Sequence, residues 1–417
     1  MPSSNSKVGK GPPRILLFGY NGANNTGSEA RLIAIIEDVR KVFGPDAVIV
    51  VPTLNEANLR RYMREDEHLR IAPIPSIFFF ALRRLVKHSD LVMLVEGSCF
   101  MDTWAGALLL AFLSSSKYAE SYHIPMIAYA VDSGKLSDRW VKRVRKEASK
   151  IDLLITRTQV SADRLRKWGV TAPIEVTDDT AFTLDVGTED GTLQRLWPES
   201  RNVAGMAVVD FNIWPVVIRP IGRSRDCYRW PYYFSRSKER REASEQLAVN
   251  LAAEADHLVE SHDKFIALIA MEAVDEHLAR RVRELMKFKD RTRVFSSNDH
   301  DAATMTRILR SLDLLITSRY HASVLSMAGG VPQVALGHDL RLHDLYKESG
   351  LLDEFFIKRK AEDAWQRLRR IDDRLVNERE SLRQRILRIN AEHEAKAKRN
   401  VELLREFALK WGLPVVE

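Results

Sequence analysis

Short apolar runs alternate along the chain with longer segments in which apolar residues recur at helical spacing. The run Arg14–Phe18 leads into a loop rich in Gly and Asn, and apolar residues then recur every three or four positions from Ala30 to Phe43. Further apolar runs that predict strands are Ala47–Pro52, Leu91–Val95, Ile124–Ala130, Ile151–Thr156, Phe265–Ile269, Arg293–Phe295, Leu312–Thr317 and Gln333–Leu336. Because continuous apolar runs between helices are typical of parallel sheets covered on both faces, the sequence predicts an α/β protein with doubly wound sheets.

One short segment occurs twice in the chain. Asp152–Thr156 (DLLIT) recurs as Asp313–Thr317, and a Gly-Val pair follows each copy at the same offset. This match favours two similar doubly wound domains that face one another. Residues 185–202 are polar, contain Gly and lack periodicity, so the domain boundary is expected there. We therefore expect Rossmann-like domains at residues 14–190 and 203–352.

Three segments stand outside this scheme. Residues 1–13 have the composition of a short disordered tail. Residues 227–245 are aromatic and basic, and we expect them to form an ordered loop over the cleft, ahead of a helix around Ser244–His262. Residues 353–417 are expected to form a C-terminal helical extension. Its apolar stripe fades after Ile389, which favours an amphipathic helix docked on the body over a separate coiled coil.

Composition restricts the class of protein. Hydrophobic residues make up 45% of the 417 residues and charged residues 29%, which excludes a disordered or collagen-like chain. The two cysteines, Cys99 and Cys227, exclude a disulfide scaffold and a Cys-rich zinc site, and they fit a reducing compartment. No apolar run approaches the roughly 20 residues that span a bilayer, and no apolar signal segment follows the N-terminal tail. We therefore expect a cytoplasmic protein.

The formal charge of +7 favours anionic partners, such as phosphorylated small molecules or an anionic membrane face. Basic residues are interleaved with acidic ones along the chain instead of forming one block. We therefore expect no nucleic-acid partner, and a solvated surface of mixed charge explains the composition equally well.

The loop Gly19–Glu29 (GYNGANNTGSE) joins a predicted strand to a predicted helix. Free amides at a helix N-terminus bind anions or sugar hydroxyls, so Asn21 and Asn24 are candidate ligand contacts. The loop has neither the dinucleotide-binding spacing of glycines nor a P-loop Gly-Lys-Ser/Thr. Thr26 and Glu29 fit a capping box, so Glu29 either caps the helix or contacts a ligand.

A second candidate follows the predicted strand that ends at Thr317. Arg319 comes at the carboxyl end of this strand, where open α/β sheets bind ligands, and His321 comes in the first turn of the next helix. An arginine, free amides and an imidazole together suit a phosphate or a carboxylate. Arg219, at the end of another apolar stretch, could join Arg319 at the same anion. Alternatively, His321 is a capping or core histidine and Arg319 forms an interdomain salt bridge.

Four acidic residues at predicted strand ends, Glu96, Asp102, Asp132 and Asp179, are candidates to orient or deprotonate sugar hydroxyls. Acidic residues at such positions are also common turn formers. The other histidines considered show no metal-ligand spacing, so no metal is predicted; they are His257, His262, His277, His300, His338 and His343.

Taken in order, these segments resemble the polysaccharide pyruvyl transferase family. The family's opening G-Y-x-G-x-x-N-x-G-[DS]-E-A loop is matched from Gly19 to Ala30, and its closing D-x-x-I-x-x-R-x-H pattern is matched from Asp313 through Arg319 and His321 to Pro332. Its middle pattern is matched by Arg157, Ser161, Leu165, Gly169 and Asp179. The family's glycine-rich stretch is replaced by Glu96–Asp102 (EGSCFMD), and the 227–245 insertion is larger than typical, so the acceptor is not specified.

The resemblance implies two Rossmann-like domains similar to GT-B glycosyltransferases, with the acceptor side in the N-terminal domain and the donor side in the C-terminal domain. It implies transfer of the pyruvyl group of phosphoenolpyruvate to two hydroxyls of one sugar, giving a cyclic ketal and phosphate. Arg219 and Arg319 would then clamp the donor, His321 would be the acid, and Asp179 or Asp102 would be the base. The expected substrate-binding residues are Gly19, Asn21, Gly22, Asn24, Gly27, Glu29, Glu96, Asp102, Asp132, Asp179 and Arg341.

The expected partners are phosphoenolpyruvate as co-substrate, with no other cofactor, and a sugar or lipid-linked oligosaccharide acceptor. A lipid-linked acceptor would bring the protein to the inner membrane face. Two other functions remain open: a GT-B-type glycosyltransferase that uses a nucleotide-activated sugar, and a non-catalytic member of a synthesis complex. Fold-level similarity does not decide among them.

Overall fold

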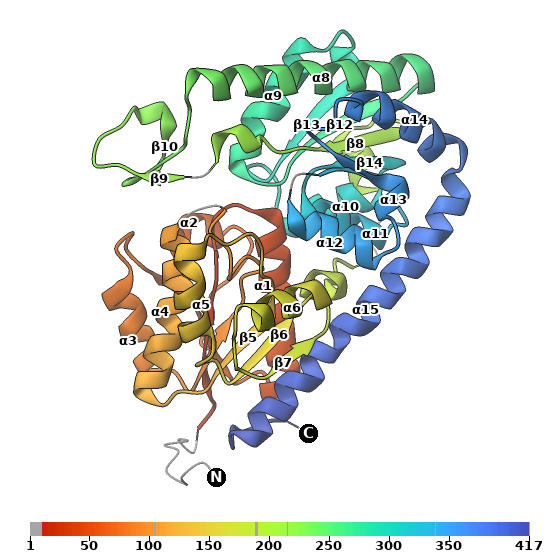
Figure 1. The fold of residues 1–417 in the computed structure, drawn as a ribbon. Helices are drawn as coiled ribbons and strands as arrows, with labels where there is room; N and C mark the ends of the chain where they lie inside the picture. Colours follow the sequence, from red (N-terminus) through yellow and green to blue (C-terminus); the bar gives the residue numbers. More distant parts are fainter. Residues whose placement is uncertain (1–10, 104–105, 188–190, 215, 338, 417) are drawn as a thin grey trace. The chain divides into compact units, whose positions relative to one another are not determined.

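The computed structural model describes residues 11–103, 106–187, 191–214, 216–337 and 339–416, and these divide into two compact units (Figure 1). Unit 1 is formed by the described parts of Met1–Ala23, Ser28–Leu184 and His393–Glu417, and unit 2 by those of Asn24–Gly27 and Asp185–Glu392. Of the predicted disordered tail at 1–13, the first ten residues lie outside the described residues.

Unit 1 is built on a seven-stranded parallel sheet with the order β3-β2-β1-β4-β5-β6-β7. Its strands are β1 (Arg14–Phe18), β2 (Val48–Thr53), β3 (Leu69–Pro73), β4 (Leu91–Leu94), β5 (Met126–Val131), β6 (Leu153–Thr156) and β7 (Ile174–Val176). Its helices are α1 (Thr26–Phe43), which begins in unit 2, α2 (Glu56–Leu59), α3 (Phe79–Lys87), α4 (Gly106–Tyr122), α5 (Asp138–Ala148), α6 (Gln159–Lys167) and the short η1 (Thr180–Thr183).

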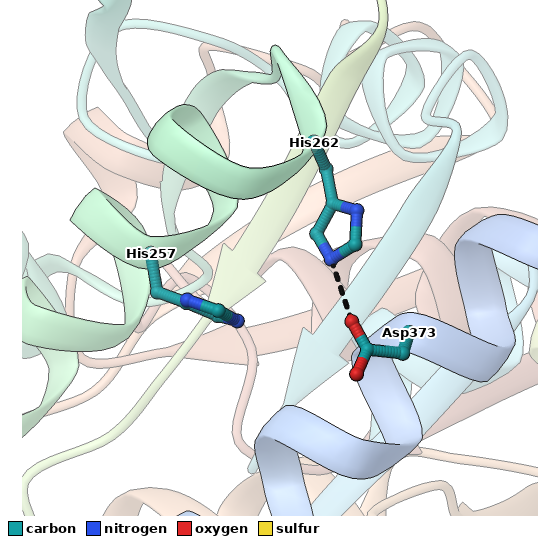
Figure 2. A group of neighbouring side chains, drawn as sticks. All are labelled: His257, His262 and Asp373. Atoms are coloured by element: carbon teal, nitrogen blue, oxygen red, sulfur yellow. Dashed lines mark ion pairs between the residues drawn. The ribbon is translucent and has the colours of Figure 1, made fainter.

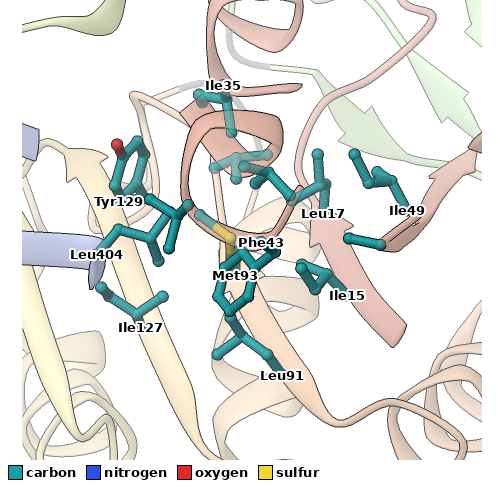
Figure 3. Close-up of a cluster of buried hydrophobic side chains, with 14 of the residues drawn as sticks. Ile15, Leu17, Ile35, Phe43, Ile49, Leu91, Met93, Ile127, Tyr129 and Leu404 are labelled. Atoms are coloured by element: carbon teal, nitrogen blue, oxygen red, sulfur yellow. The ribbon is translucent and has the colours of Figure 1, made fainter. Parts of the chain in front are cut away.

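Both faces of this sheet are buried, as the continuous apolar runs predict. Successive residues of a strand point to opposite faces, so Ile15 and Leu17 pack in one hydrophobic cluster with residues of α1, while Leu16 packs in another with residues of α3 and α4. Figure 3 shows the first cluster, in which Leu404, from the far C-terminal part of the chain, lies close to Ile127.

Unit 2 is built on a six-stranded parallel sheet with the order β13-β12-β8-β14-β15-β16. Its strands are β8 (Val203–Ala207), β12 (Phe265–Ala270), β13 (Thr292–Ser296), β14 (Leu314–Thr317), β15 (Gln333–Gly337) and β16 (Phe356–Lys358). Its helices are α7 (Thr192–Leu196), α8 (Lys238–His262), α9 (Glu276–Leu285), α10 (Ala302–Arg310), α11 (Tyr320–Met327), α12 (Leu340–Glu348), α13 (Leu352–Phe355) and α14 (Ala364–Asn377), and its 3₁₀ turns are η2 (Phe211–Ile213), η3 (Ser224–Asp226), η4 (Ala273–Asp275) and η5 (Lys289–Arg291).

The prediction of an α/β protein with two doubly wound sheets is confirmed. The repeated DLLIT segments, however, do not hold equivalent places. The first copy contains β6, which lies two strands away from β4, where the strand order of its sheet reverses. The second copy contains β14, which lies directly beside β8, at the reversal of the unit 2 sheet. The repeat therefore reflects the likeness of strand–helix units, not matching positions in the two units.

The aromatic segment at 227–245 is not the loop that we expected. Cys227–Arg229 (β10) and Tyr232–Tyr233 (β11) form antiparallel strands, and β11 also pairs with β9 (Val217–Ile218). The following helix, α8, starts at Lys238, earlier than predicted, because the Ser237 side chain caps it by accepting from the amide of Arg240. Strands of two or three residues carry too little pattern to be recognised from sequence.

The C-terminal extension is helical, as predicted, and its last helix is α15 (Arg379–Lys410). The prediction that its apolar stripe fades after Ile389 is wrong. Leu403, Leu404 and Phe407 are buried in the core of unit 1, although α15 begins in unit 2. No helix within the described ranges combines the length and the apolar character needed to cross a membrane.

Candidate functional site

In unit 1, strand order reverses between β1 and β4, and the loops that leave these strands therefore flank a switch point of the sheet. Ligands of open α/β sheets bind at such points, outside the carboxyl ends of the strands. The loop after β1 begins with Gly19, and the loop after β4 begins around Glu96. The unit 1 candidates are thus concentrated at one edge of the sheet.

Hydrogen bonds of its own polar groups fix the conformation of the loop after β1. The buried Asn21 donates from Nδ2 to the carbonyl of Leu17 at 3.1 Å, and its carbonyl accepts from Thr53 Oγ1 at 2.9 Å. The carbonyl of Gly22 accepts from the side chain of Asn58 at 3.1 Å. Asn21 and Gly22 therefore shape the loop against the end of β2, and Gly19 lies beside Val95 at the end of β4.

Glu96 joins the loops after β1 and β4. Its carboxylate accepts from the amide of Tyr20 at 3.2 Å and from the hydroxyl of Ser98 at 2.9 Å. The Cys99 thiol donates to the carbonyl of Glu96, and burial raises the pKa of this thiol well above its usual value. Cys99 is therefore a buried thiol that stays protonated at neutral pH.

Behind these loops, two arginines and two aspartates form a buried ion network. Arg157, after β6, places both Nε and Nη2 at 2.9 Å from Asp132 Oδ2, and its Nη1 pairs with Asp179. Nε of Arg31, from α1, lies 3.3 Å from Asp179 Oδ1. A Cβ at Gly97 would lie 2.6 Å from Arg31 Nη1 and 2.8 Å from Arg157 Nη1, so only glycine lets the β4 loop approach this closely.

The network changes how the predicted acids can act. Asp132 and Asp179 are fully buried and both are paired with Arg157, so neither is an open carboxylate. Asp102 instead accepts from the amide of Ser137 at 3.2 Å and from its hydroxyl, and it is only partly buried. Buried carboxylates must be paired, and the sequence could not tell which cation each would meet.

The predicted capping box does not form with Thr26 as its cap. The helix α1 begins at Thr26, and Asn25 caps it instead, with Oδ1 accepting from the amide of Gly27 at 3.0 Å. Glu29 lies in the first turn of α1 and is almost fully buried, near Tyr62, whose pKa is raised by burial and then by the Glu29 charge.

In unit 2, strand order reverses between β8 and β14, and Arg319 follows β14 at that point. The guanidinium is engaged by two carboxylates of the same unit, and not by the interdomain salt bridge that was the alternative interpretation. Arg319 Nη1 lies 3.2 Å from Glu272 Oε2, and Nη2 pairs with Asp275. The remaining Nε is buried and has no hydrogen-bond acceptor among the described residues.

Sequence reasoning missed Glu272 and Asp275. Glu272 follows the buried strand β12, two strands from β14 in the sheet, so its place after an apolar run was the available signal. Burial raises the pKa of Asp275 to about 7, even though the Arg319 guanidinium acts in the opposite direction. A buried carboxyl group with a raised pKa therefore lies beside Arg319, as is common at functional sites.

Residues 24–27 belong to unit 2 and pack against this group. The Asn24 carbonyl accepts from Ser297 Oγ at 3.1 Å, and its side-chain amide donates to Asn298. Asn25 donates to Glu272 Oε2 at 3.2 Å. The next contact in the chain is between Gly27 and His321, where a Cβ on the glycine would overlap the imidazole ring.

The structure thus brings Asn24, Gly27, Arg319 and His321 together in unit 2, with Glu272 and Asp275 added. Arg219 is exposed after β9 and has no ion pair among the described residues. Arg341 in α12 pairs with Asp339, the residue that caps its own helix. The unit 2 cluster combines a held guanidinium, a half-buried imidazole and a carboxyl group with a near-neutral pKa, which suits proton transfer on an anionic ligand.

The model of the family described as polysaccharide pyruvyl transferase matches residues 25–339. Among solved structures, the chain is similar to the UDP-GlcNAc 2-epimerase of Neisseria meningitidis bound to UDP-GlcNAc (11% identity, 95% of this chain and 99% of that chain, TM-score 0.61). It is also similar to the Methanocaldococcus jannaschii UDP-GlcNAc 2-epimerase (12% identity, 94% of this chain and 99% of that chain, TM-score 0.60). A third similar structure is Anabaena HepE in complex with UDP (13% identity, 95% of this chain and 100% of that chain, TM-score 0.59). At these identities the likeness concerns the GT-B-like fold, and no curated protein sequence matches the chain.

Proposed function

Because the chain belongs to the polysaccharide pyruvyl transferase family, we propose that it transfers the pyruvyl group of phosphoenolpyruvate to two hydroxyls of one sugar. The product is a cyclic ketal, and phosphate is released. The observation that carries this proposal is the cluster of His321, Arg319 and Asp275 at the switch point of unit 2, with Gly27 against the imidazole.

The chemistry needs one proton donor and a proton acceptor for each hydroxyl. We assign the donor role to His321, which protonates the methylene carbon of phosphoenolpyruvate and leaves an oxocarbenium-like centre at the neighbouring carbon. A sugar hydroxyl adds to that carbon and loses its proton, the carbon–oxygen bond to phosphate breaks, and the second hydroxyl closes the ketal. Of the two carboxylates predicted as the base, we propose Asp102, because it is only partly buried, whereas Asp179 is fully buried and held by Arg157.

Phosphoenolpyruvate carries a phosphate and a carboxylate, and we assign these to Arg319 and Arg219. Arg319 keeps a buried Nε donor without an acceptor among the described residues, and the charge of the exposed Arg219 is not engaged by a described ion pair. We propose that the acceptor, a sugar or a lipid-linked oligosaccharide, meets the loops after β1 and β4 of unit 1. No cofactor besides phosphoenolpyruvate is proposed for the reaction. A cytoplasmic location is proposed as well, since Cys99 and Cys227 are free thiols.

Calorimetric titration with phosphoenolpyruvate tests the donor site. Arg319→Lys keeps the charge beside Glu272 and Asp275 but loses the planar donor set, so it should weaken donor binding about ten- to a hundredfold. His321→Gln should bind the donor nearly as well as wild type but release no phosphate. The exposed His277→Gln is the matched control and should behave as wild type.

One observation favours a second candidate, because two of the similar structures contain UDP or UDP-GlcNAc. A glycosyltransferase would give heat with UDP or a UDP-sugar and none with phosphoenolpyruvate. That result would overturn the pyruvyl transferase proposal for this chain.

A further inference from the structure

Two histidines of α8 and an aspartate of α14 converge away from both switch points. One ring nitrogen of His257, one of His262 and one carboxylate oxygen of Asp373 all lie within 4.8 Å of one another (Figure 2). His262 is the last residue of α8, and its Nε2 lies 3.0 Å from Asp373 Oδ1. The sequence spacing predicted no metal ligands here, because the third group comes from a helix more than one hundred residues later.

Only one of the two ring nitrogens of His257 is hydrogen-bonded among the described residues. Its Nδ1 lies 3.1 Å from the hydroxyl of Ser261. Its Nε2 is buried, has no hydrogen-bond partner among the described residues, and points toward Asp373 in Figure 2. An imidazole whose other nitrogen is hydrogen-bonded is the usual form of a histidine metal ligand.

Two further acidic residues lie near this group. Buried Glu254, one turn before His257 on α8, and buried Asp372, next to Asp373, both face this helix contact. Arg369 Nε lies 3.5 Å from Glu254 Oε2.

We propose that His257, His262 and Asp373 bind one divalent transition-metal ion such as Zn²⁺, with water in a fourth position, and that the ion ties α14 to α8. Two nitrogens and one carboxylate oxygen are ligands that Zn²⁺ accepts, and neighbouring ligands of a tetrahedral zinc lie roughly 3.3 Å apart. The 3.0 Å separation of His262 Nε2 and Asp373 Oδ1 is close to that spacing. The site is structural and does not depend on the proposed reaction.

Calorimetric titration of the full chain with Zn²⁺ after chelation tests this site, and its readout is separate from enzyme activity. Wild type should bind one ion and melt at a higher temperature with the metal. Asp373→Asn, at a side chain that is 54% exposed, should fold normally and bind at least tenfold more weakly, as should His262→Gln. His277→Gln, on the exposed side of α9, should bind as wild type. The absence of zinc binding, or equal binding by Asp373→Asn, would show a plain histidine–carboxylate contact and overturn the proposal.

A separate surface of unit 1 supports a second inference. On α3, Leu82 and Val86 are buried, while Phe80 is 84% exposed and shares the outer face with Arg84 and Lys87. Positions four and seven residues apart lie on one side of a helix. Ile77, which precedes α3, is 64% exposed.

The geometry points to an anionic lipid surface as the partner of this face. An amphipathic helix with exposed aromatic and basic residues inserts its apolar groups at the headgroup boundary while its cations meet anionic lipids. The proposal rests on the proposed function in one respect: a lipid-linked acceptor would lie at the same membrane surface. The basic Arg84 and Lys87 favour such a surface over an uncharged protein partner.

Flotation with phosphatidylcholine vesicles, with and without phosphatidylglycerol, tests the face without measuring catalysis. Wild type should float with the anionic vesicles, and Arg84→Ser with Lys87→Ser should reduce binding about thirtyfold. Phe80→Ser should also reduce it, whereas Ile221→Ser, at an equally exposed apolar residue of unit 2, should not. No binding to anionic vesicles, or self-association that Phe80→Ser abolishes, would overturn the lipid assignment.

Discussion

The imidazole of His321 lies directly against the backbone of Gly27, so that a Cβ atom on Gly27 would overlap Nδ1 and Cγ of the ring. The two residues are almost three hundred positions apart, yet both belong to unit 2. A glycine in the first turn of α1 is thus explained by the histidine that it meets and not by its own helix.

Gly27→Ala should displace the His321 ring and reduce phosphate release from phosphoenolpyruvate at least tenfold. Alanine is a better helix former than glycine by about 1 kcal/mol, so α1 itself would gain from the change. A loss of activity would therefore come from the displaced ring. Steady-state kinetics of phosphate release would measure it, with Gly11→Ala as control, because a Cβ at Gly11 meets nothing within 4 Å. Unchanged kcat/KM in Gly27→Ala would contradict this role for the contact.

The buried network of unit 1 predicts a large difference between two arginines. Arg157→Ala leaves Asp132 and Asp179 without their principal cation and should cost about 3–5 kcal/mol of the unfolding free energy. Arg166→Ala removes an exposed pair with Asp163 and should cost no more than about 1 kcal/mol. Urea unfolding followed by circular dichroism would compare the two variants. Similar losses in both would show that the buried pairs add nothing beyond surface pairing.

Asp38 is buried and lies outside both candidate sites, and it should make the free energy of unfolding depend on pH. Burial raises the pKa of Asp38 to about 6, although it accepts from Tyr129 Oη at 3.0 Å. The folded state then holds this proton more tightly than the unfolded state does. This contribution is most favourable below about pH 4 and is lost as pH rises to about 6.

Asp38→Asn should abolish the loss of stability between pH 4 and pH 6, because the amide carries no charge. Its oxygen can still accept the hydrogen bond from Tyr129. At pH 8 the variant should be more stable than wild type by up to about 3 kcal/mol, with a smaller difference at pH 5. Unfolding free energies measured from pH 4 to pH 8 would check the slope. Parallel curves for the two proteins would show that Asp38 does not titrate as stated.

Most central strands of both sheets could be predicted because burial on two faces makes each of them a continuous apolar run. The exception is β8, a central strand of the unit 2 sheet that was missed because its sequence, VAGMA, consists largely of Ala and Gly. The missed strands lack that signature for physical reasons. β3 alternates buried and exposed positions at the sheet edge, and β7 and β16 have three residues each. Edge position and short length remove the pattern on which the prediction depends.

The candidate site could be predicted only in part, for a related reason. Arg319, Glu96 and Asp132 were found because they follow strands, and parallel strands end at one edge. Their partners depend on strand order, which the sequence does not state. The pairing of Arg319 with Glu272 across β8, and of Asp132 with Arg157, needed the assembled sheets.

The end of α15 provides a last test, since residues 393–416 complete the core of unit 1. Leu404 is fully buried in the cluster of Figure 3, whereas Leu409, five residues later on the same helix, is 60% exposed. Leu404→Ala opens a cavity and should cost about 2–5 kcal/mol of unfolding free energy. Leu409→Ala removes the same atoms from water-exposed surface and should change it by no more than about 0.5 kcal/mol. Urea unfolding would separate the two variants. Equal stability would mean that the C-terminal helix covers unit 1 without supporting its core, and truncation before His393 would then leave unit 1 folded.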